Sequence, residues 1–157
     1  MRGFGNRRYW LLSVLFLVLF APFANGADNQ VKWHSFSEGR KKAEIEKKPM
    51  VVDFYTDHAC PRCREMERHV YGNPEIARKL NSDFIPVRID LGRDLEFEEK
   101  MLGERYGYRE DCLLLFLDRN EKVMKDASGK ALCFTSVVTP DAFLDYLEIA
   151  RKKLFDR

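Results

Sequence analysis

The sequence has no internal repeat, no low-complexity tract and no long linker. Its net charge is also close to zero when residues 1–26 are left out. The chain has 27 basic and 25 acidic residues, and residues 1–26 contain three arginines and no acid, which leaves 24 basic and 25 acidic residues. The remaining 131 of the 157 residues therefore have a net charge of −1. A near-neutral body gives no reason to expect nucleic-acid or membrane-surface binding, and its length suits one domain with its own core.

A long apolar run, Trp10 to Phe20, follows a basic stretch near the N-terminus. Small residues at Ala24 and Gly26 complete the pattern of a secretory signal, with cleavage expected after Gly26. The run is short for a membrane span, which needs about 20 residues. Apolar residues extend to Phe23, so an uncleaved anchor is the alternative. Because no cysteine lies near the cleavage site, a lipoprotein anchor is excluded. We expect an exported protein, periplasmic if bacterial, with a mature domain over 27–157 and membrane contact only through an uncleaved signal.

Cysteine is scarce, and all four cysteines lie after this segment, at positions 60, 63, 112 and 133. Thiols pair in an oxidising compartment, and four cysteines allow three pairings. The local pairing of Cys60 with Cys63 is the expected one. These two residues follow a strand-like run, Met50 to Tyr55, and open a helix-like run. A helix N-terminus stabilises a thiolate, the species that attacks disulfides, so the arrangement indicates redox chemistry.

The remaining pattern predicts alternating helices and strands. Phe36, Ala43 and Ile45 have loose helical spacing, and Leu95, Met101 and Leu102 are expected to face inward. Strands that are apolar on both faces predict a sheet covered by helices on each side. Helices are expected over 35–48, 61–70, 75–80, 95–106 and from 139 onward, and strands over 50–55, 84–90 and 113–117, with weaker strand candidates at 123–124 and 131–135.

This order, with Cys-x-x-Cys after the first inner strand, resembles the thioredoxin fold from about Trp33 to Leu147. The resemblance includes Val52-Asp53-Phe54-Tyr55, Tyr106-Gly107-Tyr108-Arg109 and Leu113-Leu114-Leu115-Phe116. A subgroup of exported thioredoxin-like proteins is similar at Trp33, Ala43, Lys48-Pro49, Cys60-Pro61-Arg62-Cys63, Met66-Glu67 and Phe84-Ile85-Pro86-Val87. The implied fold is α/β, with a central mixed β-sheet flanked by helices on both faces.

The resemblance implies that Cys60 is the attacking thiol and Cys63 the resolving thiol. Asp53 matches a buried carboxylate that helps to move protons, and burial should raise its pKa so that it can accept the Cys63 proton. The alternative is a strand-edge residue satisfied by hydrogen bonds. Pro61 and Arg62 are expected to modulate the pair. The positive charge of Arg62 should stabilise the Cys60 thiolate and raise the redox potential above that of thioredoxin, about −270 mV. Its alternative is a solvated surface side chain.

Two stretches depart from the family pattern. Ala59 stands where thioredoxins carry tryptophan, and His58 adds a residue to the approach and either supports the thiolate or lies exposed. In the substrate loop at Asp111 and Cys112, Cys112 occupies the position of a cis-proline. Cys112 is therefore a small buried residue, a partner for exchange with Cys60, or a metal ligand. A structural bridge between Cys112 and Cys133 is a further alternative.

The leading hypothesis is an exported thiol–disulfide oxidoreductase that exchanges the Cys60–Cys63 pair with protein substrates and an unidentified redox partner. We expect a monomer without a cofactor or bound metal. One rival is a Zn or Cu(I) thiolate module that uses Cys60, Cys63 and either Cys112 or His58. The absence of a second Cys-x-x-Cys speaks against it, and haem attachment is excluded because Arg64 follows Cys63. The other rival is a redox-inert binding protein whose motif is only a clip.

Overall fold

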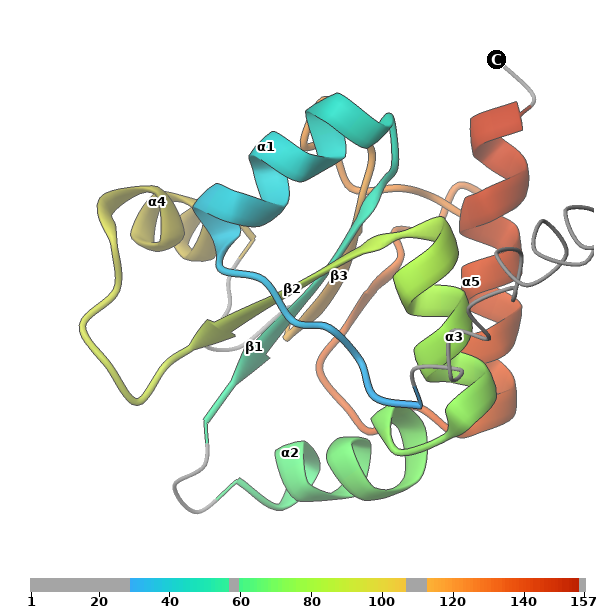
Figure 1. Cartoon of the computed structure of the whole chain (residues 1–157), viewed down its shortest axis with the longest axis horizontal. Coiled ribbons are helices and arrows are strands. Elements are labelled where there is room, and N and C mark those ends of the chain that lie inside the picture. Colours follow the sequence, from blue (N-terminus) through green and yellow to red (C-terminus); the bar gives the residue numbers. More distant parts are fainter. Residues whose placement is uncertain (1–28, 57–59, 107–112, 156–157) are drawn as a thin grey trace, which may run out of the picture.

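The computed structural model describes residues 29–56, 60–106 and 113–155, and five α-helices, a π-helical segment and four strands lie within them. The predicted mixed sheet with helices on both faces is confirmed (Figure 1). In chain order the elements are α1 (Phe36–Glu46), β1 (Met50–Tyr55), α2 (Pro61–Glu65), η1 (Met66–Tyr71), α3 (Pro74–Asp83), β2 (Ile85–Asp90), α4 (Phe97–Tyr106), β3 (Leu114–Leu117), β4 (Cys133–Phe134) and α5 (Pro140–Phe155).

The sheet has the strand order β2-β1-β3-β4. Strands β1 and β2 are parallel, and the crossover between them consists of α2, η1 and α3. Strand β3 is antiparallel to both β1 and β4. A parallel bridge from His34 to Val87 adds one more pairing at the outer edge of β2. This places β1, which leads into the cysteine motif, in the interior of the sheet.

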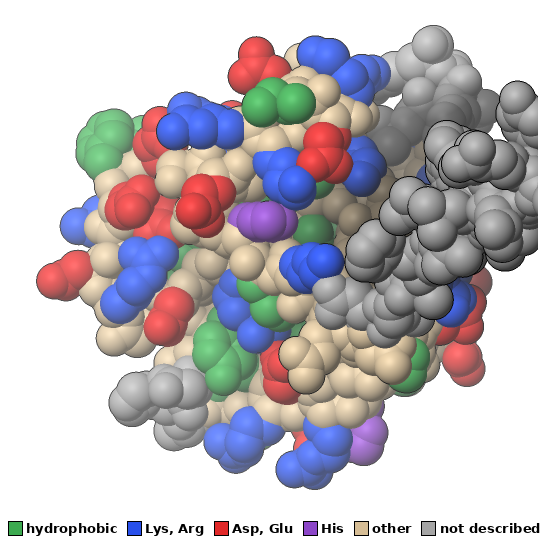
Figure 2. Space-filling model, viewed as in Figure 1, with side chains coloured by type: hydrophobic (Ala, Val, Ile, Leu, Met, Phe, Trp, Pro, Cys, Tyr) green, Lys and Arg blue, Asp and Glu red, His purple; other side chains and the backbone are tan. Residues whose placement is uncertain are grey.

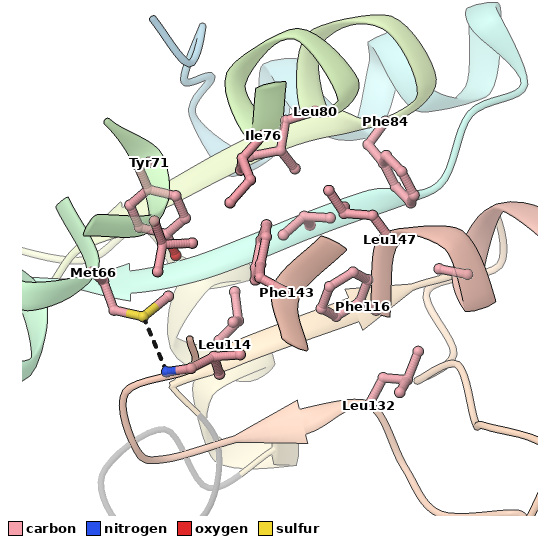
Figure 3. Close-up of a cluster of buried hydrophobic side chains, with 14 of the residues drawn as sticks. Met66, Tyr71, Ile76, Leu80, Phe84, Leu114, Phe116, Leu132, Phe143 and Leu147 are labelled. Carbon is pink, nitrogen blue, oxygen red and sulfur yellow. Dashed lines mark hydrogen bonds between the residues drawn. The ribbon is translucent and has the colours of Figure 1, made fainter. Parts of the chain in front are cut away.

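Two layers of helices bury the sheet. Helices α1 and α4 cover one face, and α3 and α5 cover the other (Figure 1). Side chains of β1 alternate between them: Val52 and Phe54 enter the α1–α4 core, while Val51 enters the α3–α5 core. Figure 3 shows the α3–α5 core, in which the Met66 sulfur accepts a hydrogen bond from the Val138 N–H at 3.5 Å.

Local signals explain where the helices begin. Ser35 and Glu38 form a reciprocal capping box at the start of α1. Asn73 caps α3 through its side-chain oxygen, and proline occupies the first helical position. Within α1, Gly39 lies so close to β2 that an added Cβ would sit 2.3 Å from Val87 Cγ2. The absence of a side chain at this position lets α1 approach the sheet.

Several sequence expectations are wrong in detail. Met101 is 43% exposed and does not face inward as expected, and Ile45, placed at loose helical spacing with Ala43, is 80% exposed. At about 100° per residue, Ile45 lies on the opposite side of its helix from Ala43, and Met101 is turned away from buried Leu102. Helix α4 begins at Phe97. The expected helix over 61–70 is α-helical only to Glu65 and continues as the π-helical η1. The two weak strand candidates reduce to β4 and isolated bridges.

Candidate active site

Cys60 is the N-cap residue of α2 and forms a disulfide with Cys63, as its spacing predicted. The two Cα atoms are 5.3 Å apart, and Pro61 begins the helix. The Cys63 N–H donates to the Cys60 sulfur at 3.1 Å. A backbone donor aimed at this sulfur would favour negative charge on it after reduction.

The two sulfur-bearing residues are not equally accessible. Cys60 is half-buried, whereas Cys63 is only 4% exposed. An incoming thiol or disulfide therefore reaches Cys60 more readily than Cys63. This is the asymmetry that an attacking and a resolving thiol require.

Asp53 lies in the middle of β1, on the same face as Val51, and its side chain is 2% exposed. Its Oδ1 accepts from both Arg62 Nη atoms at 3.4 Å, and its Oδ2 accepts from Arg88 Nη2 at 3.5 Å. Burial raises the pKa of the Asp53 carboxyl, and the charges of Arg62 and Arg88 oppose this rise. The carboxylate is thus both buried, as the resemblance implied, and supplied with partners.

Arg62 is not the solvated surface residue that the sequence left as an alternative. Its side chain is 10% exposed and its guanidinium pairs with Asp53. The charge expected to act on the Cys60 thiolate is therefore already balanced by a carboxylate. The expected redox potential above about −270 mV stays a prediction, and its support moves to the backbone donor beside Cys60.

Arg88 is the main residue that the sequence reasoning missed. It stands directly opposite Asp53 in the parallel register of β1 and β2. Its guanidinium carbon lies 4.0 Å from the ring centroid of Trp33 and 4.5 Å from that of Tyr55. It also donates to Glu67 at 2.8 Å. A single charged side chain in the otherwise apolar stretch Ile85–Ile89 was the signal that could have pointed to it.

Tyr71, at the end of η1, faces the same carboxylate. Within the described part of the chain, its buried hydroxyl makes no hydrogen bond of ordinary geometry, and the same holds for the Nε atoms of Arg62 and Arg88. Burial and the neighbouring Asp53 charge nevertheless raise the Tyr71 pKa well above its ordinary value. Asp53, Arg62 and Arg88, together with the Tyr71 hydroxyl beside them, form what we call the buried charge cluster, and the half-exposed Glu67 pairs with Arg88 at its edge.

Other predicted site residues can be placed only in part. His58, Ala59, Asp111 and Cys112 lie outside the described residues, as does the predicted signal segment 1–26. Cys133 is disulfide-bonded. Among the side chains that the structure describes, no group of three or more His, Cys, Asp and Glu is arranged to hold a metal ion. No helix in the described ranges is long and apolar enough to cross a membrane.

The surface around these elements carries charges of both signs. On the face shown in Figure 2, the described Lys and Arg side chains are intermixed with Asp and Glu side chains. That face therefore presents no extended field of one sign.

Comparison with known proteins finds similarity to a family, to a sequence relative and to solved structures. The sequence model of a family described as thioredoxin-like matches residues 32–107. An uncharacterized protein of Archaeoglobus fulgidus is 31% identical over 87 residues, which are 55% of this chain and 68% of the relative. Among solved structures, a DsbH oxidoreductase is 18% identical with a TM-score of 0.58, covering 80% of this chain and 88% of that one. The reduced C-terminal domain of Neisseria meningitidis DsbD is 23% identical with a TM-score of 0.55, covering 73% and 93%. At these identities the two structures show a shared fold.

Proposed function

We propose that this chain, which belongs to the thioredoxin-like family, is an exported thiol–disulfide oxidoreductase acting on protein substrates. The observation that carries the proposal is the Cys60–Cys63 disulfide at the start of α2, with one accessible and one buried sulfur-bearing residue. The Asp53 carboxylate, which forms an ion pair with Arg62 of the Cys-x-x-Cys motif, further supports the proposal.

In the reducing direction, the Cys60 thiolate attacks a substrate disulfide. One substrate sulfur leaves as a thiolate, and the other forms a mixed disulfide with Cys60. The Cys63 thiol then loses its proton and attacks the Cys60 sulfur, which releases the second substrate sulfur and closes the Cys60–Cys63 disulfide. Two electrons pass from the dithiol to the substrate, and the reverse sequence oxidises a substrate dithiol.

The direction of electron flow depends on the redox potential and on the partner that restores the dithiol or the disulfide. Proteins that bear thiols or disulfides are the proposed substrate class, in keeping with the similarity to the DsbH oxidoreductase. We propose a monomer that acts without a cofactor. Export rests on the basic and apolar pattern of residues 1–26.

The proposal is tested by changing the two cysteines separately. Cys60→Ser should abolish insulin disulfide reduction and refolding of a scrambled substrate. Cys63→Ser should instead accumulate a mixed disulfide on Cys60, visible as a reducible adduct on a non-reducing gel. Arg64→Gln, an exposed change in the same helix, is the control and should keep activity. Activity that survives Cys60→Ser would falsify the proposal.

A further inference from the structure

Arg62 has one ion-pair partner within the described residues, and that partner is Asp53. Arg88, the second cation on Asp53, also pairs with Glu67 and stacks on Trp33 and Tyr55. The two arginines therefore depend on Asp53 to different degrees. Arg62, which comes from the Cys-x-x-Cys motif itself, depends on it most.

Protonation of Asp53 would leave the positive charges of Arg62 and Arg88 without the carboxylate charge that they share. Arg62 would lose its carboxylate partner while its side chain is 10% exposed. Arg62 and Arg88 each already have a buried Nε without a hydrogen bond, so neither guanidinium is fully solvated. Because a buried cation without a counter-ion is unfavourable, the two arginines favour the ionised form of Asp53 and oppose the burial that raises its pKa.

We propose that Arg62 is a positioning residue that keeps Asp53 a carboxylate at neutral pH, ready to take the Cys63 proton. This inference rests on the proposed function and assigns the middle of the motif a role in its resolving step. In that step Asp53 gains the proton of the Cys63 thiol, a bond forms between the Cys63 and Cys60 sulfurs, and the bond from Cys60 to the substrate breaks. The substrate sulfur leaves as a thiolate, so protons and electrons balance.

The groups that face Asp53 come from three elements. Arg62 lies on α2, Arg88 on β2 and Tyr71 on η1, and Glu67, also on η1, pairs with Arg88. Of the influences that lower the Asp53 pKa, the charge of Arg62 is the largest, ahead of that of Arg88. Removal of Arg62 should therefore raise the Asp53 pKa more than removal of Arg88.

The direct test is a carbon NMR titration of Asp53 in the oxidised, ¹³C-Asp-labelled full chain, with Asp53→Asn used to assign the signal. In the unsubstituted protein Asp53 should be ionised at pH 7. Arg62→Gln should increase its proton affinity at least tenfold, which is about one pKa unit or 1.4 kcal/mol. Arg62→Lys, which keeps the charge, should change it less than threefold. Arg64→Gln, which removes an exposed arginine two residues away, should leave it unchanged.

Three results would overturn the inference. These are a protonated Asp53 at pH 7 in the unsubstituted chain, an Arg62→Gln variant that titrates like Arg64→Gln, and an Arg62→Lys variant shifted as far as Arg62→Gln. If Arg62→Gln does not fold, the titrations of Asp53 in the unsubstituted protein and in Arg62→Lys still test the inference. The titration needs no substrate, so it stays readable even if Cys60→Ser retains activity and the proposed function fails.

A kinetic measurement links the carboxylate to the chemistry. Below the raised Asp53 pKa of Arg62→Gln, single-turnover release of substrate from the Cys60 mixed disulfide should slow about tenfold per pH unit relative to the unsubstituted protein, because the ionised fraction of the carboxyl falls by that factor. The rate should recover as the pH rises above the new Asp53 pKa. A merely structural role of Arg62 would slow release equally at every pH, and that outcome would also overturn the inference.

Discussion

Replacement of Arg62 by Gln should destabilise the folded protein by an amount that depends on pH. The change leaves Asp53, 2% exposed, with Arg88 as its remaining cation at 3.5 Å. Breaking a buried ion pair by removing one partner costs about 3–5 kcal/mol. The Arg62–Asp53 distance of 3.4 Å is longer than in the strongest charge-assisted pairs, and Arg88 stays in place, so the loss should lie at or below the low end of that range. We expect a loss between about 1.4 kcal/mol, the equivalent of one pKa unit, and about 3 kcal/mol.

The sign of the pH dependence follows from the Asp53 pKa. Burial raises this pKa above its ordinary value of 3.8 in the unsubstituted protein, and loss of Arg62 should raise it further. A carboxyl with a raised folded-state pKa destabilises the fold as the pH rises through that pKa. The cost of Arg62→Gln should therefore be largest at alkaline pH. It should shrink by about 1.4 kcal/mol per pH unit between the two folded-state pKa values, because a protonated Asp53 needs no cation.

The assay is urea unfolding of the oxidised chain from pH 5 to pH 8, carried out as a double-mutant cycle. The four proteins are the unsubstituted chain, Arg62→Gln, Asp53→Asn and the double variant. Once Asp53 is an amide, Arg62→Gln should cost little, and the cost should no longer change with pH. Equal costs in both backgrounds, or a cost that does not vary with pH, would refute the electrostatic argument.

Three further predictions concern other parts of the molecule. Gly39→Ala should lower the free energy of unfolding in urea by about 1–3 kcal/mol, because its Cβ would lie 2.3 Å from Val87 Cγ2. The double variant with Val87→Ala should lose less stability than the sum of the two single changes. Two lysines lower the Glu46 pKa to about 2 from 4.5, so its stabilisation is present above pH 4.5 and lost as the pH falls towards 2. The urea midpoints of Glu46→Gln and the unsubstituted chain should converge over that interval. After reduction, iodoacetamide should modify half-buried Cys60 before Cys63, which is 4% exposed, as followed by peptide mass spectrometry.

Local patterns in the sequence were enough to predict the layered α/β fold and the pairing of Cys60 with Cys63. These features depend on residues that are close together along the chain: apolar runs, capping residues and the two-residue spacer between the cysteines. The π-helical η1 was not predictable, because a change from α- to π-type hydrogen bonding over six residues hardly alters the apolar spacing.

The buried charge cluster depends on tertiary structure. Asp53 could be singled out from its place in a matched strand, but its partners could not. Arg88 lies 35 positions along the chain and meets Asp53 only through the register of two parallel strands. The sequence predicts that Arg62 acts on its neighbour Cys60, because proximity along the chain does not reveal that its side chain pairs with Asp53 of β1.

The pairing of Asp53 with Arg88 also has a consequence for how the strands align during folding. Strands β1 and β2 are largely apolar, so their side chains alone would tolerate several alignments. A slip by one residue would place Asp53 beside Val87 or Ile89 instead of Arg88. The carboxylate would then be buried away from its cross-strand cation, which makes the shifted alignment unfavourable. The Asp53 carboxylate that serves the proposed chemistry therefore also selects, through Arg88, one strand alignment over its neighbours.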